Sequence, residues 1–288
     1  MRILVCSLVM VLAACSLEGG TTVTPPPPAT TPPATSAVTT SPATSPETIP
    51  TDAPVCPEGD VMLADGGILD FERGTFDGTR IADITWRQDG DCQRFSVSFA
   101  TEDGAPATTP PALTARILRN AGVIRIETAA TASVVSDQLV EEGSLERLFV
   151  PVAEEGRRFV DLVLSQPAVA RARILTSPAR LEIELQPGGP EVGRPLMTPE
   201  VVVVEPGSAA EAGGVLDVTG YATGDIESLT AEVLLGDRVV IEDTLSLEPS
   251  PNVWTAFHLI LPVGEDPYDT LRLTTPDGSV VAAIPFNR

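Results

Sequence analysis

The stretch RARILTSPARLEIEL, residues 171–185, decides the fold class of the region around it. Its second half places Leu181, Ile183 and Leu185 on one phase and glutamates on the other. Alternation with a period of two is typical of a β-strand that buries one face and leaves the other in solvent. A Ser-Pro turn separates this strand from an earlier one, which we expect over residues 169–175.

The same alternation recurs through residues 55–190. Phe95, Val97 and Phe99 share one phase of a further strand, and turn-forming Gly, Asp and Pro residues separate the strands from one another. Only residues 133–142 have the pattern of a short helix. Many short strands with frequent turns favour a β-sandwich, so we expect one here.

Residues 199–288 predict a second β-sandwich. Every second residue from 229 to 233 is apolar, and a Gly-Asp turn follows. Residues 254–261 are apolar on both phases, which predicts a central strand with Trp254 in the core between the two sheets. About seven strands in this length, with no cysteine pair, suit an immunoglobulin-like sandwich that is not of the antibody type.

Two segments of the first unit carry a resemblance to the AMIN domain. Residues 171–185 resemble its closing motif, in which a strand, an x-Pro-x-Arg turn and a final alternating strand follow one another. Residues 92–99, CQRFSVSF, resemble the opening strand of the AMIN-like domain of actinobacterial lipoproteins. The likeness covers residues 80–187. AMIN domains are envelope-targeting modules, so it implies binding to peptidoglycan or another wall polymer.

The second unit resembles the Gmad2 immunoglobulin-like domain of bacterial spore germination proteins. The likeness keeps its order and spacing over nearly the whole unit, and it implies a function in the cell envelope. The segments that carry it are EPGS (205–208), LDVTGYA (216–222), IE (226–227), WTAF (254–257) and DGS (277–279).

The N-terminus has the three parts of a secretory signal. Arg2 precedes the apolar run of residues 3–12, which is too short to span a membrane. Residues 12–15, LAAC, resemble a bacterial lipobox. That resemblance implies removal of residues 1–14 and a thioether-linked lipid with palmitate on Cys15, which would anchor the protein at the extracytoplasmic face of the cell membrane. The alternative is an ordinary signal peptide with an incidental cysteine.

Residues 15–54 predict a disordered tether. They are rich in Pro and Thr, and they contain almost no bulky apolar side chains. Such a segment buries too little surface to offset its chain entropy. Its prolines favour an extended chain at about 3.1 Å per residue, which would carry the folded part away from the membrane.

The remaining cysteines, Cys56 and Cys92, predict one disulfide. An exported protein with two leftover thiols most simply pairs them. The alternative is a redox or metal pair, for which no CxxC spacing or second ligand set is present.

The composition excludes several classes of chemistry. The formal net charge is -22, all 18 basic residues are arginine, and His258 is the only histidine. A Walker loop, a Schiff base and a Ser–Lys dyad all need lysine. A multi-histidine zinc site needs more histidines, and nucleic-acid binding needs a basic field. We therefore expect no cofactor, no metal and no nucleic acid.

Few residues stand out as candidates for a site. Arg171, Arg173 and Arg180 gather around one turn and are candidate contacts for an anionic polymer, with charge balance on an acidic surface as the alternative. We interpret His258 as a packed or edge histidine. We interpret the acidic segments 89–91 and 265–269 as solvated turns rather than calcium loops, because they lack EF-hand spacing.

These observations predict a non-catalytic, lipid-anchored envelope protein with two β-sandwiches that binds or scaffolds. Its partners would be a wall polymer or envelope proteins. Two alternatives remain open. One is an accessory subunit of another exported protein, for which an exposed apolar patch would be the sign. The other is an envelope hydrolase that uses a pair of carboxylates.

Overall fold

The computed structural model describes residues 61–63, 67–72, 74–207, 214–248, 253–264 and 267–286. All of these lie in one compact unit bounded by Thr51 and Arg288. The predicted signal peptide and tether lie outside the described residues. Apart from a 3₁₀ turn at Glu154–Gly156, the regular secondary structure of the described chain consists of β-strands, so the all-β prediction is confirmed. No helix in this part of the chain has the length and apolar character needed to cross a membrane.

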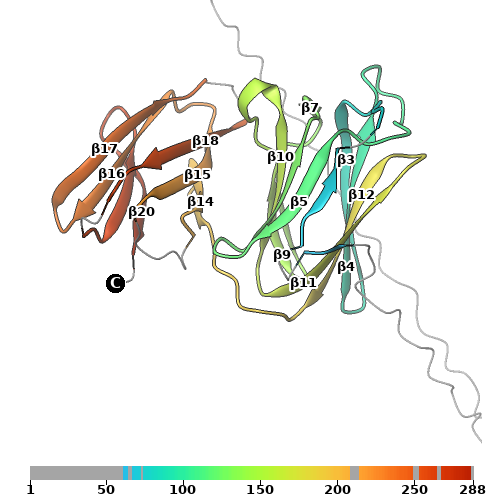
Figure 1. The fold of residues 1–288 in the computed structure, drawn as a ribbon, viewed down its shortest axis with the longest axis horizontal. Coiled ribbons are helices and arrows are strands. Elements are labelled where there is room, and N and C mark those ends of the chain that lie inside the picture. The colour runs from blue at the N-terminus through green and yellow to red at the C-terminus, as the bar shows by residue number, and fades with distance from the viewer. Residues whose placement is uncertain are drawn as a thin grey trace, which may run out of the picture. The chain divides into compact units, whose positions relative to one another are not determined.

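The first sandwich consists of two six-stranded sheets (Figure 1). One sheet has the order β1-β11-β12-β4-β3-β7 and the other has the order β2-β5-β6-β10-β9-β8. The inward phase of the alternating strands fills the core between them, including Phe95, Val97, Leu181 and Ile183. The strands are β1 (Val61–Met62), β2 (Leu69–Phe71), β3 (Arg80–Asp89), β4 (Cys92–Ala100), β5 (Leu113–Leu118), β6 (Val123–Thr128), β7 (Ala132–Ser133), β8 (Asp137–Glu142), β9 (Leu145–Phe149), β10 (Arg158–Leu164), β11 (Ala168–Leu175) and β12 (Arg180–Pro187).

The predicted helix at residues 133–142 is wrong. The segment contains β8, which pairs antiparallel with β9. Gly143 begins the turn between the two strands at a φ of 62°, a conformation that glycine adopts without steric cost. Val134 is 64% exposed and Leu139 is 57% exposed, so the helix-like spacing of apolar residues does not mark a buried face.

The second sandwich packs the sheet β13-β14-β15-β18 against the sheet β17-β16-β19-β20 (Figure 1). With β14 as strand A, these orders correspond to A-B-E and C′-C-F-G, the arrangement of an immunoglobulin-like sandwich. The strands are β13 (Leu196–Met197), β14 (Val201–Glu205), β15 (Leu216–Thr223), β16 (Ser228–Leu235), β17 (Arg238–Ser246), β18 (Trp254–Leu261), β19 (Thr270–Thr274) and β20 (Val280–Pro285).

The strand at residues 254–261 is not central, as the sequence predicted, but lies at the edge of its sheet. Phe257 and Leu259 face the core of the second sandwich, whereas Ile260 is 60% exposed. Trp254 does not lie in that core either, because it belongs to a separate cluster between the two sandwiches.

Strand β14 is buried on both faces. Val201 and Val203 pack into the core of the second sandwich. Val202 and Val204 point the other way and pack against the first sandwich. A run of four valines is therefore explained by two different apolar contacts, one on each face of the same strand.

The two sandwiches meet at an apolar joint. Here the outer face of the sheet containing β6, β9 and β10 packs against the outer face of the sheet containing β14, β15 and β18. The Trp254 ring stands edge-on to Phe149 at 5.2 Å and to Tyr221 at 5.9 Å between ring centroids. The joint consists of Ala121, Val123, Phe149, Val163, Val202, Val204, Tyr221 and Trp254, all buried.

Backbone hydrogen bonds also cross the joint. The Val152 N–H donates to the Trp254 carbonyl at 2.8 Å, and the Ala256 N–H donates to the Val152 carbonyl at 2.8 Å. Val152 thereby covers the start of the β18 edge in a parallel bridge. Apolar packing and main-chain pairing together fix the faces of the two sandwiches against each other.

Candidate functional site

The candidate site is the outer face of the sheet β1-β11-β12-β4-β3-β7. Because successive side chains alternate across a sheet, the inward position of Phe95 and Ile183 places Arg94 and Glu184 on the outside. The register aligns Arg87, Arg94, Glu184 and Arg171 in one row across four strands. The next row contains Thr85, Ser96, Glu182 and Arg173, and Ser98 lies opposite Arg180 in the row after it.

We call this surface the arginine face. It is defined by Arg87, Arg94, Arg171, Arg173 and Arg180 with Glu182 and Glu184. The sequence prediction placed Arg171, Arg173 and Arg180 around one turn, and the structure brings them together on one face.

Two glutamates lie beneath the arginines and connect them. The Arg94 Nε donates to Glu184 Oε1 at 2.6 Å. The Arg173 guanidinium donates to Glu182 Oε2 at 2.9 and 2.7 Å, and the Arg180 Nε donates to Glu182 Oε1 at 2.9 Å. The side chains of Glu184 and Glu182 are 2% and 8% exposed, whereas those of the three arginines are 25–37% exposed. The solvent-facing layer of this face is therefore basic.

Glu182 keeps its negative charge to a lower pH than a free glutamate does. Burial raises the pKa of Glu182, but the hydrogen bonds and charges of Arg173 and Arg180 have a larger, opposite effect. The pKa of Glu182 is therefore lowered. A guanidinium has five N–H donors in a planar fork, more than one carboxylate oxygen accepts. The ion pairs thus orient the guanidinium groups without using all of their donors.

A hollow of about 450 Å³ lies on the arginine face. Its lining combines the guanidinium groups of Arg87, Arg94 and Arg180 with the hydroxyls of Thr85, Ser96 and Ser98. Trp86 and the Glu182 carboxylate, which Arg180 binds, complete it. Guanidinium groups suit phosphate and carboxylate oxygens, and hydroxyls both donate and accept. Such a lining can hold an anionic, hydroxyl-rich chain.

Sequence reasoning missed Arg87 and Arg94. Arg94 stands directly before the alternating strand Phe95–Phe99, so its outward phase was readable. What the sequence did not show is that β12 lies between β11 and β4, which joins the four strands into one surface. Arg87 joins the face only through the register of β3 with β4.

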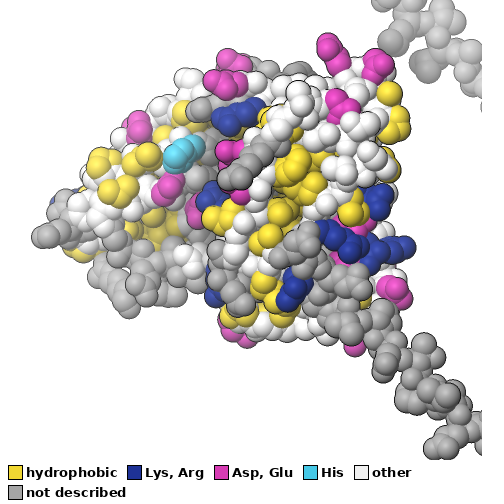
Figure 2. Space-filling model, turned by 45° about the vertical axis from the view of Figure 1, so that its right-hand side comes forward, with side chains coloured by type: hydrophobic (Ala, Val, Ile, Leu, Met, Phe, Trp, Pro, Cys, Tyr) yellow, Lys and Arg dark blue, Asp and Glu magenta, His cyan; other side chains and the backbone are white. Residues whose placement is uncertain are grey.

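The other predicted positions lie apart from the arginine face. His258 is on the edge strand β18 (Figure 2, cyan), and its Nε2 lies 2.8 Å from Asp217 Oδ1. Of the first acidic segment, Asp89 ends β3 at the margin of the arginine face, and Gly90 and Asp91 form the exposed β3–β4 turn. Glu265 and Asp266 of the second acidic segment lie outside the described residues. Across the described ranges, no three or more His, Cys, Asp or Glu residues are grouped so that they could hold a metal ion.

Cys92 opens β4 and is disulfide-bonded. Cys56, its predicted partner, lies outside the described residues, as does Cys15. The pairing of Cys56 with Cys92 and the lipid on Cys15 remain predictions.

No protein-family model, no curated protein and no solved structure matches the chain significantly. The resemblances to the AMIN and Gmad2 domains therefore stay predictions. The fold and the site define an all-β protein of two joined sandwiches, the first of which has an arginine-rich sheet face.

Proposed function

We propose that this chain is a non-catalytic, lipid-anchored envelope protein whose arginine face binds an anionic cell-wall polymer. The lipid on Cys15 would hold it at the extracytoplasmic face of the cell membrane, and residues 15–54 would let the sandwiches reach the wall. The resemblance of the two sandwiches to AMIN and Gmad2 domains supports an envelope role.

The observation that carries the proposal is the concentration of positive charge on one surface. Five of the 18 arginines of the chain lie on the arginine face, although the net charge of the chain is -22. Even with Asp83 and Asp89 at its margins, the face has five positive charges against four negative ones among the described residues. A polyanion is repelled by the acidic protein as a whole, so attraction requires a local basic surface.

Co-sedimentation of the full-length chain with purified peptidoglycan sacculi tests the proposal. The variant Arg87→Gln/Arg180→Gln removes two charges and leaves Glu182 paired with Arg173. We expect its affinity for sacculi to fall about tenfold, since each exposed charge contributes about 0.7 kcal/mol. Binding of the parent should also weaken as salt is added, because salt screens exposed charges.

The matched control is Arg119→Gln/Arg238→Gln, which removes two exposed arginines outside the arginine face. It should bind sacculi like the parent. Absence of sedimentation at low salt, or equal loss in both double variants, would refute wall binding by this face. Release of soluble wall fragments during the assay would contradict the non-catalytic part and favour the hydrolase alternative.

A further inference from the structure

We propose a second binding site, for a short peptide with free amino and carboxyl ends, in the cleft between the two sandwiches. It is independent of the arginine face, which lies on the opposite sheet of the first sandwich. The cleft has a volume of about 300 Å³, within the range of small-molecule sites, and such sites occur preferentially where domains meet.

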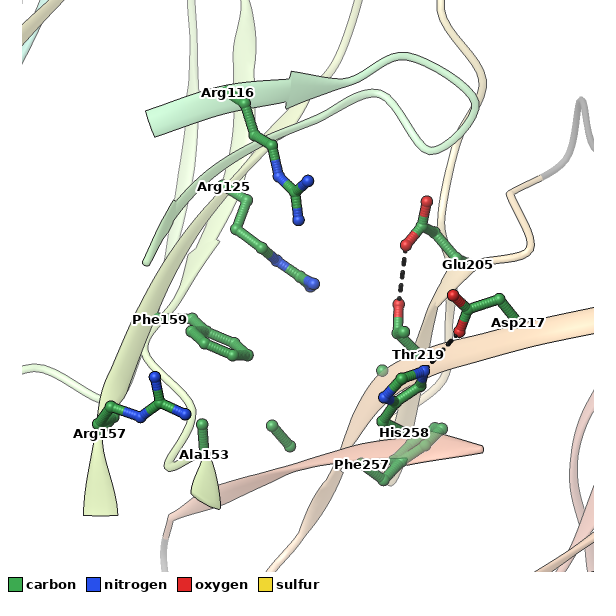
Figure 3. A pocket seen from close by; sticks show the side chains of 12 residues that line it. Arg116, Arg125, Ala153, Arg157, Phe159, Glu205, Asp217, Thr219, Phe257 and His258 are labelled. Atoms are coloured by element: carbon green, nitrogen blue, oxygen red, sulfur yellow. Dashed lines mark hydrogen bonds and ion pairs between the residues drawn. The ribbon is translucent and has the colours of Figure 1, made fainter. Parts of the chain in front are cut away.

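The two walls of the cleft differ in charge (Figure 3). Arg116, Arg125 and Arg157 project into it from the first sandwich. Glu205 and Asp217 project into it from the second sandwich, on β14 and at the start of β15. A ligand in this space therefore meets cations on one side and carboxylates on the other.

The floor of the cleft is fixed before any ligand arrives. The Arg125 guanidinium donates to both oxygens of Asp161, at 2.9 and 2.7 Å, and both side chains are buried. The guanidinium carbon also lies 5.0 Å from the centre of the Phe159 ring. The neighbouring joint holds the two walls in place, so binding needs little reorganisation.

Arg116 pairs with Glu127 at 3.0 Å, and Asp217 makes a hydrogen bond of 2.8 Å with the His258 ring. Two further charges in the cleft have no ion-pair partner among the described residues. Arg157 is exposed and has no carboxylate partner among the described residues. Glu205 accepts a hydrogen bond of 3.3 Å from the Thr219 hydroxyl and has no ion pair in the described chain.

The two unmatched charges have opposite signs and lie on opposite walls (Figure 3). A zwitterion with separated ends would satisfy both, with its carboxylate at Arg157 and its ammonium group at Glu205.

The open edge of β18 favours a peptide over other zwitterionic ligands. Trp254 and Ala256 direct their main-chain groups away from β15, toward Val152. In an antiparallel ladder this orientation recurs at every second residue, so His258 also directs its N–H and C=O groups away from β15. His258 lines the cleft just beyond the position that Val152 covers. A peptide main chain can pair with such an open edge, whereas an amino acid with no amide groups between its ends cannot.

Calorimetric titration of the full-length chain with trialanine tests the proposal. Trialanine should bind at least about tenfold more tightly than N-acetyl-trialanine or trialanine amide, because each block removes one charge-assisted contact. Arg157→Gln should abolish the discrimination against the amide and retain the discrimination against the N-acetyl form. Glu205→Gln should do the reverse.

The control variants Arg119→Gln and Glu191→Gln change exposed charges outside the cleft and should bind all three peptides like the parent. Arg87→Gln/Arg180→Gln should also bind trialanine normally, which separates this site from the arginine face. No heat of binding up to about 10 mM peptide, equal affinity for blocked and free forms, or unchanged discrimination in both cleft variants would overturn the proposal.

Discussion

Replacing Trp254 by alanine should uncouple the unfolding of the two sandwiches. Trp254 is 7% exposed and packs edge-on against Phe149 of the first sandwich. A buried tryptophan removes about 150–250 Å² from solvent, which at 25 cal/mol per Å² corresponds to about 4–6 kcal/mol. Measured Trp→Ala losses in cores are about 3–5 kcal/mol. We expect a loss of about 4 kcal/mol at the joint, a thousandfold weaker coupling.

The assay uses the fact that the chain has only two tryptophans. In Trp254→Ala, the fluorescence of Trp86 reports the first sandwich alone, and scanning calorimetry reports both. The parent should unfold in one calorimetric transition, and Trp254→Ala in two, of which only one coincides with the change in Trp86 fluorescence.

The matched control is Trp86→Ala, because Trp86 packs against the core of the first sandwich and makes no contribution to the joint. It should lower stability and leave the transitions coupled. A single transition in Trp254→Ala, with a loss below about 1 kcal/mol, would refute the assignment of Trp254 to a coupling joint.

Two further predictions concern buried charges. Asp161→Asn should lower the free energy of unfolding in urea by about 3–5 kcal/mol, because it leaves Arg125 buried without its counter-charge. Glu127→Gln, in the exposed pair with Arg116, should lower it by less than about 1 kcal/mol. Equal losses in the two variants would contradict this reasoning. Glu182→Gln should cost about 1 kcal/mol at pH 7. Because the pKa of Glu182 is lowered from 4.5, its contribution to stability is present above pH 4.5 and is lost as the pH falls through the lowered pKa. The stabilities of parent and variant should therefore converge below the lowered pKa, and a difference that grows at low pH would have the wrong sign.

Sequence alternation predicted the strands well because a half-buried strand has only one apolar face. It does not say what covers the second face of a strand that is apolar on both faces. In β14 the run of valines makes apolar contacts on both faces. In β18 a similar pattern led to the wrong prediction of a central strand, since Ile260 is exposed and a position at the sheet edge has no local sequence signal. The partner of an outer face is decided by tertiary structure.

The same limit applies to the candidate sites. The spacing of Arg171, Arg173 and Arg180 within one hairpin was visible because hairpin neighbours are close in sequence. Arg87 and Arg94 join them only through non-local strand pairing. The cleft is still less predictable, because Arg157 and Glu205 belong to different sandwiches and meet only through the joint. The physical signals that were present, such as the unusual Arg125 and Asp161 within apolar strands, needed this context to be interpreted.

The joint also limits which surfaces are free to bind a polyanion. Each sandwich has two outer sheet faces, and the joint occupies one of each. The free face of the second sandwich aligns Glu242, Glu232 and Arg272 in one row, with two carboxylates for one guanidinium. The free face of the first sandwich is the arginine face. As long as the joint holds, the arginine face is the basic sheet face that the proposed wall polymer can reach. The second sandwich then takes no part in polymer binding and stays available as one wall of the cleft.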